Sequence, residues 1–91
     1  MVSATLWIDT AAERTVDLGN TLQMYVAFAE MAKLVNVDDW SDLFGVMTQV
    51  ELQEDADPQW LADVSLQAGM FLQLYDVSER TRELLEALRD I

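Results

Sequence analysis

The chain has 91 residues, 52% of them hydrophobic, and its 17 acidic and 5 basic residues give a formal net charge of −12. This length suits one domain over residues 1–91, and this charge disfavours direct binding to DNA, RNA or an anionic membrane. Because the sequence contains neither His nor Cys, imidazole and thiolate chemistry is excluded, and we expect neither an enzyme nor a cofactor or metal site.

The first nine residues suit an extended arm, because their apolar residues alternate loosely with polar ones. A lone strand would need a partner strand, so the pattern leaves open whether residues 2–8 pair. Trp7 lies on this arm rather than on a predicted core face. We therefore expect it to be the exposed tryptophan and a candidate for partner binding.

The next segment, Thr10-Ala11-Ala12-Glu13, has the pattern of a capping box, in which the Thr hydroxyl and the Glu side chain satisfy backbone N–H groups. It predicts a short helix over residues 11–18. Gly19-Asn20 then predicts a break, since a continuous helix would place Arg14 and Asp17 in the apolar arc of the following segment.

Asn20 can cap a second helix over residues 21–35, with Gln23 at its third position. On this segment Gln23, Glu30 and Lys33 form a polar strip that spans only about 80° of the helix circumference. The rest of the cylinder is apolar, so we expect this to be the central helix of the fold. Lys33 beside Glu30 is expected to be an ordinary solvated ammonium rather than a nucleophile.

A third helix is predicted over residues 39–54, capped by Asp38 or Asp39. Asp38, Asp39 and Asp42 also raise the question of a cation site. Acidic residues are favoured in the first turn of a helix by its dipole without any ligand, and this is the preferred interpretation.

A second acidic group, Glu54, Asp55 and Asp57, lies in the connection that follows. Its oxygen ligands would suit calcium, but the spacing of a calcium-binding loop is absent and Pro58 follows at once. Asp is a good N-cap and proline at the first helical position loses no hydrogen bond, so Asp57-Pro58 predicts the start of a helix over residues 58–76.

This fourth helix carries two apolar faces. Its wider face suits a core. On the opposite side Leu66, Met70 and Leu74 are spaced four residues apart and flanked by polar residues, which predicts an apolar stripe on the surface. We interpret this stripe as a candidate contact with another subunit or protein.

Ser78 is expected to cap a last helix over residues 79–91. The main helices at 21–35, 39–54, 58–76 and 79–91 are joined by short links, as in antiparallel bundles. The sequence therefore predicts an all-α fold: a compact bundle of about four main helices, with an extended N-terminal arm and a short first helix.

The favoured functional hypothesis is a protein-binding module, such as a subunit, a chaperone, or an antitoxin-like or immunity-like factor. It would bind a larger protein, or itself as a homo-oligomer, through Leu66, Met70, Leu74 and Trp7. The start of the chain has no basic region, and no apolar run approaches the roughly 18 residues of a membrane span, so a soluble cytoplasmic protein is expected.

The alternative hypothesis is an acidic inhibitor that occupies the basic nucleic-acid-binding groove of a target protein, as anti-restriction and anti-CRISPR proteins do. It depends on the stretch from residue 34 to 79, which has ten acidic residues and no basic one. Its candidate residues are Asp38, Asp39, Asp42, Glu54, Asp55 and Asp57. Adaptation to concentrated salt would explain the same charge without a function.

Overall fold

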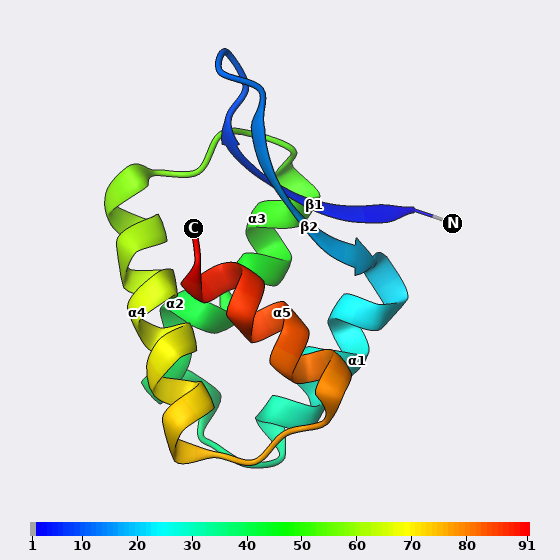
Figure 1. Cartoon of the computed structure of the whole chain (residues 1–91), viewed down its shortest axis with the longest axis vertical. Helices are drawn as coiled ribbons and strands as arrows, with labels where there is room; N and C mark the ends of the chain where they lie inside the picture. Colours follow the sequence, from blue (N-terminus) through cyan, green and yellow to red (C-terminus); the bar gives the residue numbers. More distant parts are fainter. Residues whose placement is uncertain (1) are drawn as a thin grey trace.

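The structure is a computed structural model that describes residues 2–91, and it combines an antiparallel hairpin with helices (Figure 1). The all-α prediction is therefore wrong. The elements in chain order are β1 (Ser3–Asp9), β2 (Arg14–Asn20), α1 (Thr21–Ala32), the 3₁₀ helix η1 (Val37–Trp40), α2 (Ser41–Phe44), α3 (Val46–Leu52), α4 (Pro58–Leu74) and α5 (Glu79–Arg89).

The hairpin has one face toward the helices and one toward solvent. Leu6 pairs with Val16, and Trp7 pairs with Thr15. Successive residues of a strand point to opposite faces, so Leu6 is buried in the core while Thr15 is exposed and Trp7 is partly exposed. The expected arm, whose first residue Met1 lies outside the described residues, is thus a paired strand.

The helix predicted over residues 11–18 is also wrong. The N–H of Thr10 lies 3.0 and 3.1 Å from the two carboxylate oxygens of Asp55, and the Thr10 hydroxyl donates to the same carboxylate. This hydroxyl therefore bonds across the fold instead of capping a helix. Glu13 has a φ of 55°, which is left-handed rather than helical, and the chain reverses there into β2.

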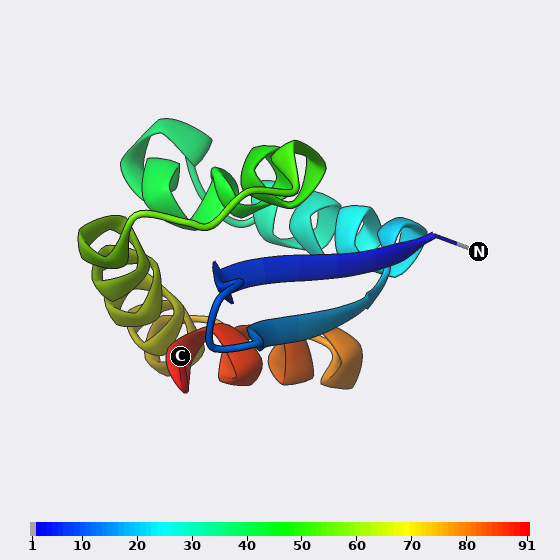
Figure 2. The same cartoon turned by 90° about the horizontal axis from the view of Figure 1, so that it is seen from above.

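Both strands pack against helices. β1 contacts α3, and β2 contacts α1 and α5; viewed from above, the hairpin lies between α1 and α3 on one side and α5 on the other (Figure 2). The N–H of Ala56 donates to the Trp7 carbonyl at 3.0 Å, and the N–H of Thr21 donates to the Val2 carbonyl at 2.9 Å. The hairpin is consequently one wall of the core.

The junction between β2 and α1 is built by a capping box. The Asn20 side chain accepts from the Gln23 N–H at 2.8 Å, and the Gln23 side chain accepts from the Asn20 N–H at 3.2 Å. Gly19 precedes this cap with a φ of 85°, and a Cβ there would lie 2.6 Å from Gln23 Oε1. Glycine is therefore required where the strand turns into the helix.

The two C-terminal helices begin at the caps that the sequence indicates. The Asp57 side chain accepts from the Gln59 N–H at 3.0 Å with Pro58 in the first turn, and the Ser78 side chain accepts from the Thr81 N–H at 3.4 Å. These caps satisfy N–H groups that have no partner inside the helix. They fix the direction of α4 and α5, which pack side by side.

The segment predicted as one helix over residues 39–54 is divided into η1, α2 and α3. Asn36, whose side chain accepts from the Asp38 N–H at 3.1 Å, starts a 3₁₀ turn ahead of the predicted caps. Trp40 then leaves helical geometry with a ψ of 36°. Its ring packs edge-on against Phe71, with centroids 5.1 Å apart, which attaches this segment to α4.

The core lies between the hairpin and the helices, and α1 forms an outer wall of it rather than its centre. Met24 and Phe28 of α1 are buried, but Leu22 is 69% exposed and Val26 is 49% exposed. The expectation of a central helix is therefore wrong. The largest fully buried side chains are Phe28, Phe71, Leu6, Met24, Met31, Leu43, Leu85, Leu88, Val46, Val64 and Thr81.

Candidate interaction surface on α4

The outward side of α4 is apolar. Leu66, Met70 and Leu74 are 64%, 45% and 62% exposed, and they form the row that we call the α4 stripe. Positions four apart follow one another along a helix face, so the row is about 12 Å long. The exposed residues of α4 after Pro58 are Gln59, Ala62, Asp63, Leu66, Met70, Gln73 and Leu74.

One flank of the α4 stripe is formed by η1 and α2. The Gln67 side chain donates to the Asp42 carboxylate at 3.3 Å and accepts from the Leu43 N–H at 3.0 Å. One helical turn further along α4, Phe71 packs against Trp40 of η1. Residues 40–43 therefore lie along this flank; Asp42 is half-buried there, and Asp38 and Asp39 just before Trp40 are exposed.

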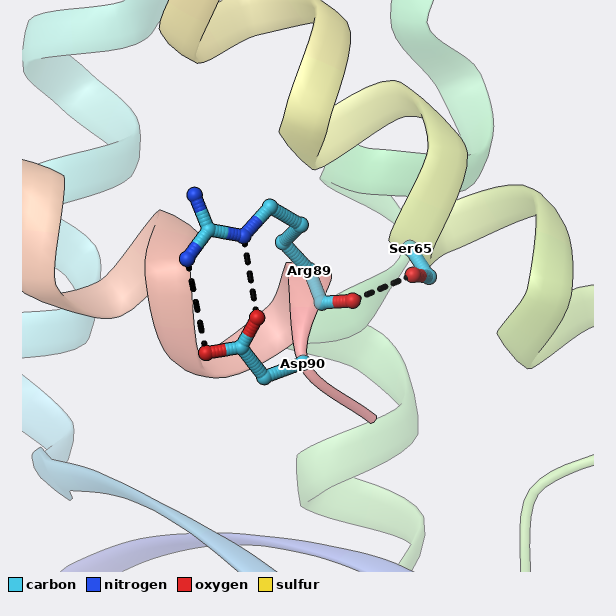
Figure 3. A network of polar contacts seen from close by, with 3 residues as sticks. All are labelled: Ser65, Arg89 and Asp90. Carbon is cyan, nitrogen blue, oxygen red and sulfur yellow. Dashed lines mark hydrogen bonds and ion pairs between the residues drawn. The ribbon is translucent and has the colours of Figure 1, made fainter.

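The other flank is formed by the end of α5 (Figure 3). The Ser65 hydroxyl donates to the Arg89 carbonyl at 2.5 Å, and the Arg89 Nε donates to Asp90 at 2.9 Å. The hydrogen bond from Arg89 holds the pKa of the Asp90 carboxyl below its ordinary value. Among residues 2–91 this is the single ion pair, so the guanidinium beside α4 is paired with its neighbouring carboxylate.

Trp7 lies apart from the α4 stripe, on the hairpin. It is partly exposed, and its carbonyl is bonded to Ala56 in the loop before α4. The four residues predicted to make an apolar contact are therefore divided between the outward side of α4 and the hairpin. The structure assembles the three-residue stripe and leaves Trp7 outside it.

The six predicted acidic residues also form two groups. Asp42 lies beside Gln67, whereas Asp57 caps α4 ten residues earlier, roughly 15 Å away along the helix axis. In the second group, Asp55 accepts from Thr10 and Asp57 accepts from the Gln59 N–H, so both carboxylates have structural partners. Glu54, beside them, is exposed.

A second apolar surface was not predicted from the sequence. The exposed Leu22, Tyr25 and Val26 lie on the outer face of α1. Val26 also lines an open groove of about 890 Å³ between α1, the end of β2 and the start of α5. The signal was present in the sequence, because α1 has more apolar residues than one buried face can accommodate.

Glu30 is a polar contact between α1 and α5. Its carboxylate accepts from the Ser78 N–H, the Ser78 hydroxyl and the Thr81 hydroxyl, each at 2.7 Å. The hydrogen bonds, led by that from the Ser78 side chain, lower the pKa of Glu30. The negative charge also lies at the amino end of α5, where the helix dipole favours it.

Replacing Glu30 with glutamine should weaken the dependence of stability on pH. Because the folded-state pKa of Glu30 is lowered, its stabilising contribution is complete above the unfolded pKa and is lost as pH falls through the folded value. Wild type should therefore lose more stability than Glu30→Gln below about pH 4.5, the ordinary pKa of this group. Urea unfolding at several pH values from 7 to 3 measures the free energy of unfolding of both proteins, with Glu83→Gln on α5 as the control.

Within residues 2–91, none of the helices combines the length and the apolar character needed to cross a bilayer. The same residues hold no group of three or more carboxylates placed to bind a metal ion. Comparison with protein-family models, with curated proteins and with solved structures finds no match.

Proposed function

We propose that the chain is a protein-binding module and that the α4 stripe is its principal contact. The observation that supports this is the composition of the outward side of α4, which presents three large apolar side chains and one charged residue, Asp63. In the whole chain 24% of residues are charged. Depletion of charge around exposed apolar residues is typical of the centre of a protein interface.

The core does not need these three side chains. The inward face of α4 already buries Leu61, Val64, Ala68 and Phe71, and the α4 stripe is not part of that cluster. Three large apolar side chains exposed in one row are a cost in solubility that a partner would remove by covering them. We propose that this covering takes place in the cytoplasm, as expected for a cysteine-free chain.

The double substitution Leu66→Asp with Met70→Asp should remove binding while leaving the fold intact. Loss of two central apolar contacts lowers affinity by roughly 100-fold or more, whereas exposed positions change stability by about 0.5 kcal/mol. The measurement is recovery of a stoichiometric partner from native lysate by the tagged chain. Leu22→Asp with Val26→Asp on α1 adds the same charge elsewhere and should retain the partner.

A second candidate function is the acidic inhibitor of a nucleic-acid-binding protein. The cation-free segment from residue 34 to 79 favours it, since the ion pair described above involves none of its ten carboxylates. The same recovery experiment separates the two, because contacts between charged surfaces weaken steeply with salt and apolar contacts do not. A partner released by salt and by reversing Asp38, Asp39 and Asp42, but retained by the α4 stripe variant, would favour the inhibitor.

A further inference from the structure

We propose that the α4 stripe and the carboxylates of η1 and α2 form one composite surface that binds an amphipathic helix with lysine or arginine along one edge. This inference rests on the proposed function and specifies the partner's chemistry. It joins two features that the sequence presents as separate, because residues 38–42 and 66–74 are brought together only by the fold.

The apolar part fits a helix. Leu66, Met70 and Leu74 lie in one row on a regular 17-residue helix, and each is at least 45% exposed. Helices that bind to an apolar surface do so through residues spaced three and four apart on one face. A partner helix packed along α4 would therefore place such residues against this row.

The charged part lies along one edge of this row. Trp40 packs on Phe71 and on Tyr75 with centroids 5.1 and 6.3 Å apart, so η1 lies beside the C-terminal half of α4. Asp42 is bonded to Gln67 near the middle of the helix. Asp42 thus lies beside the middle of the α4 stripe, and the exposed Asp38 and Asp39 precede Trp40 in the 3₁₀ turn that packs near its Leu74 end.

The opposite edge is different. There the guanidinium of Arg89, whose side chain lies close to Gly69, is paired with Asp90. Positive charge from a partner would meet three carboxylates on the η1–α2 side and an already paired arginine on the α5 side. The surface therefore favours a partner helix whose basic residues lie along a single edge.

A second copy of the chain fits this surface less well. Each copy has a net charge of −12, and in a two-fold symmetric contact the same carboxylates would face one another or lie close together. A standard interface also involves about 20 to 30 residues on each side, so the contact must extend beyond three apolar side chains. The nearest available neighbours are the carboxylates, which a basic partner would complement.

The test uses two helical peptides of about 20 residues, long enough to form a helix when bound. Both have leucine at positions spaced three and four apart, and one has lysine along one flank where the other has glutamine. The lysine peptide should bind about tenfold more tightly at low salt. Chemical-shift changes on titration should fall on α4 and on residues 38–44.

Two variants and a matched control assign the binding. Leu66→Ser with Leu74→Ser should abolish binding of both peptides without changing the melting temperature. Asp38→Asn, Asp39→Asn and Asp42→Asn together should reduce the lysine peptide to the affinity of the glutamine peptide and leave the latter unchanged. The control removes three charges elsewhere and should retain the tenfold preference: Glu13→Gln, Glu79→Gln and Glu83→Gln.

The outcomes separate this inference from the proposed function. Stripe-dependent binding that ignores the three aspartates would overturn the composite surface and leave the α4 stripe as a contact. The second outcome is that all acidic variants weaken binding of the lysine peptide equally and the stripe variant does not change it. This would overturn both the composite surface and the α4 stripe as a contact. Absence of any stripe-dependent binding at about 1 mM peptide would do the same. A stripe-dependent dimer of the chain alone, seen by sedimentation, would replace the basic helix with a second copy.

Discussion

Replacing Phe71 with alanine is expected to lower the free energy of unfolding by about 3 to 5 kcal/mol, which is the usual cost of truncating a buried phenylalanine. Phe71 is fully buried on the inward face of α4. Its ring centroid lies 5.1 Å from that of Trp40 and 4.8 Å from that of Tyr75. A domain of this size is stable by about 5 to 15 kcal/mol, so the loss is a large fraction of the total.

The matched control is Gln73→Ala, two residues along the same helix and exposed. Alanine has the higher helix propensity, so this change should be neutral within about 0.5 kcal/mol. Urea unfolding followed by tryptophan fluorescence measures both, since Trp40 contacts the altered ring. Equal effects of the two substitutions would mean that α4 does not hold η1 against the core, and the composite surface would lose its support.

The features that can be predicted from the sequence are those whose signal is local and strong. Proline tolerates the first turn of a helix and aspartate caps it, so Asp57-Pro58 predicts the start of α4 wherever the helix later packs. The α4 stripe could be predicted for the same reason, because the 3.6-residue period separates the face of Leu66 from that of Leu61 without knowledge of any neighbour.

Residues 10–20 show where local reasoning fails. Thr10 and Glu13 have the spacing of a capping box, but the Thr10 hydroxyl donates instead to the carboxylate of Asp55, 45 positions away. Nothing in residues 10–20 indicates that the Asp55 carboxylate accepts this hydrogen bond. The alternation of Thr15, Val16, Asp17 and Leu18 was a usable strand signal, and it competed with a capping pattern of similar length.

The assignment of α1 as a central helix failed for another reason. Apolar residues around a whole helix indicate burial, but the sequence does not say whether the chain itself or another molecule provides the cover. Leu22 and Val26 remain open to solvent in the structure. Hydropathy alone therefore cannot distinguish a core helix from one with an outward apolar face, which only the packing of β1, β2 and α5 resolves.

The candidate acidic residues were chosen by charge, and the fold assigns them different roles. Asp55 joins the hairpin turn to the loop before α4, and Asp57 caps that helix. Asp38 and Asp39 follow the Asn36 cap of η1 and stay exposed. The turn that carries them is attached to α4 by the packing of Trp40 on Phe71, a contact between residues about thirty positions apart that no sequence spacing indicates.

The hairpin supplies the second large prediction. Leu6→Ala is expected to cost about 2 to 5 kcal/mol, as for other fully buried leucines. Leu6 faces the helices from β1 and contributes to the same core as α1 and α4. Were residues 2–8 only an extended arm, truncation of this side chain would change stability by no more than about 0.5 kcal/mol.

Thr5→Ala is the matched control, since Thr5 lies next to Leu6 but points to the other face, opposite Asp17. Its loss should cost less than about 1 kcal/mol, the scale of strand propensity at a partly exposed position. Chemical denaturation of both variants measures the difference. A large loss of unfolding free energy for Leu6→Ala alone requires that the hairpin unfolds together with the helices. Leu6 and Thr5 are neighbours in β1 and differ chiefly in which face of the strand their side chains occupy. Equal small losses of unfolding free energy for the two variants would mean that β1 does not pack in the core and is only the extended arm that the sequence indicates.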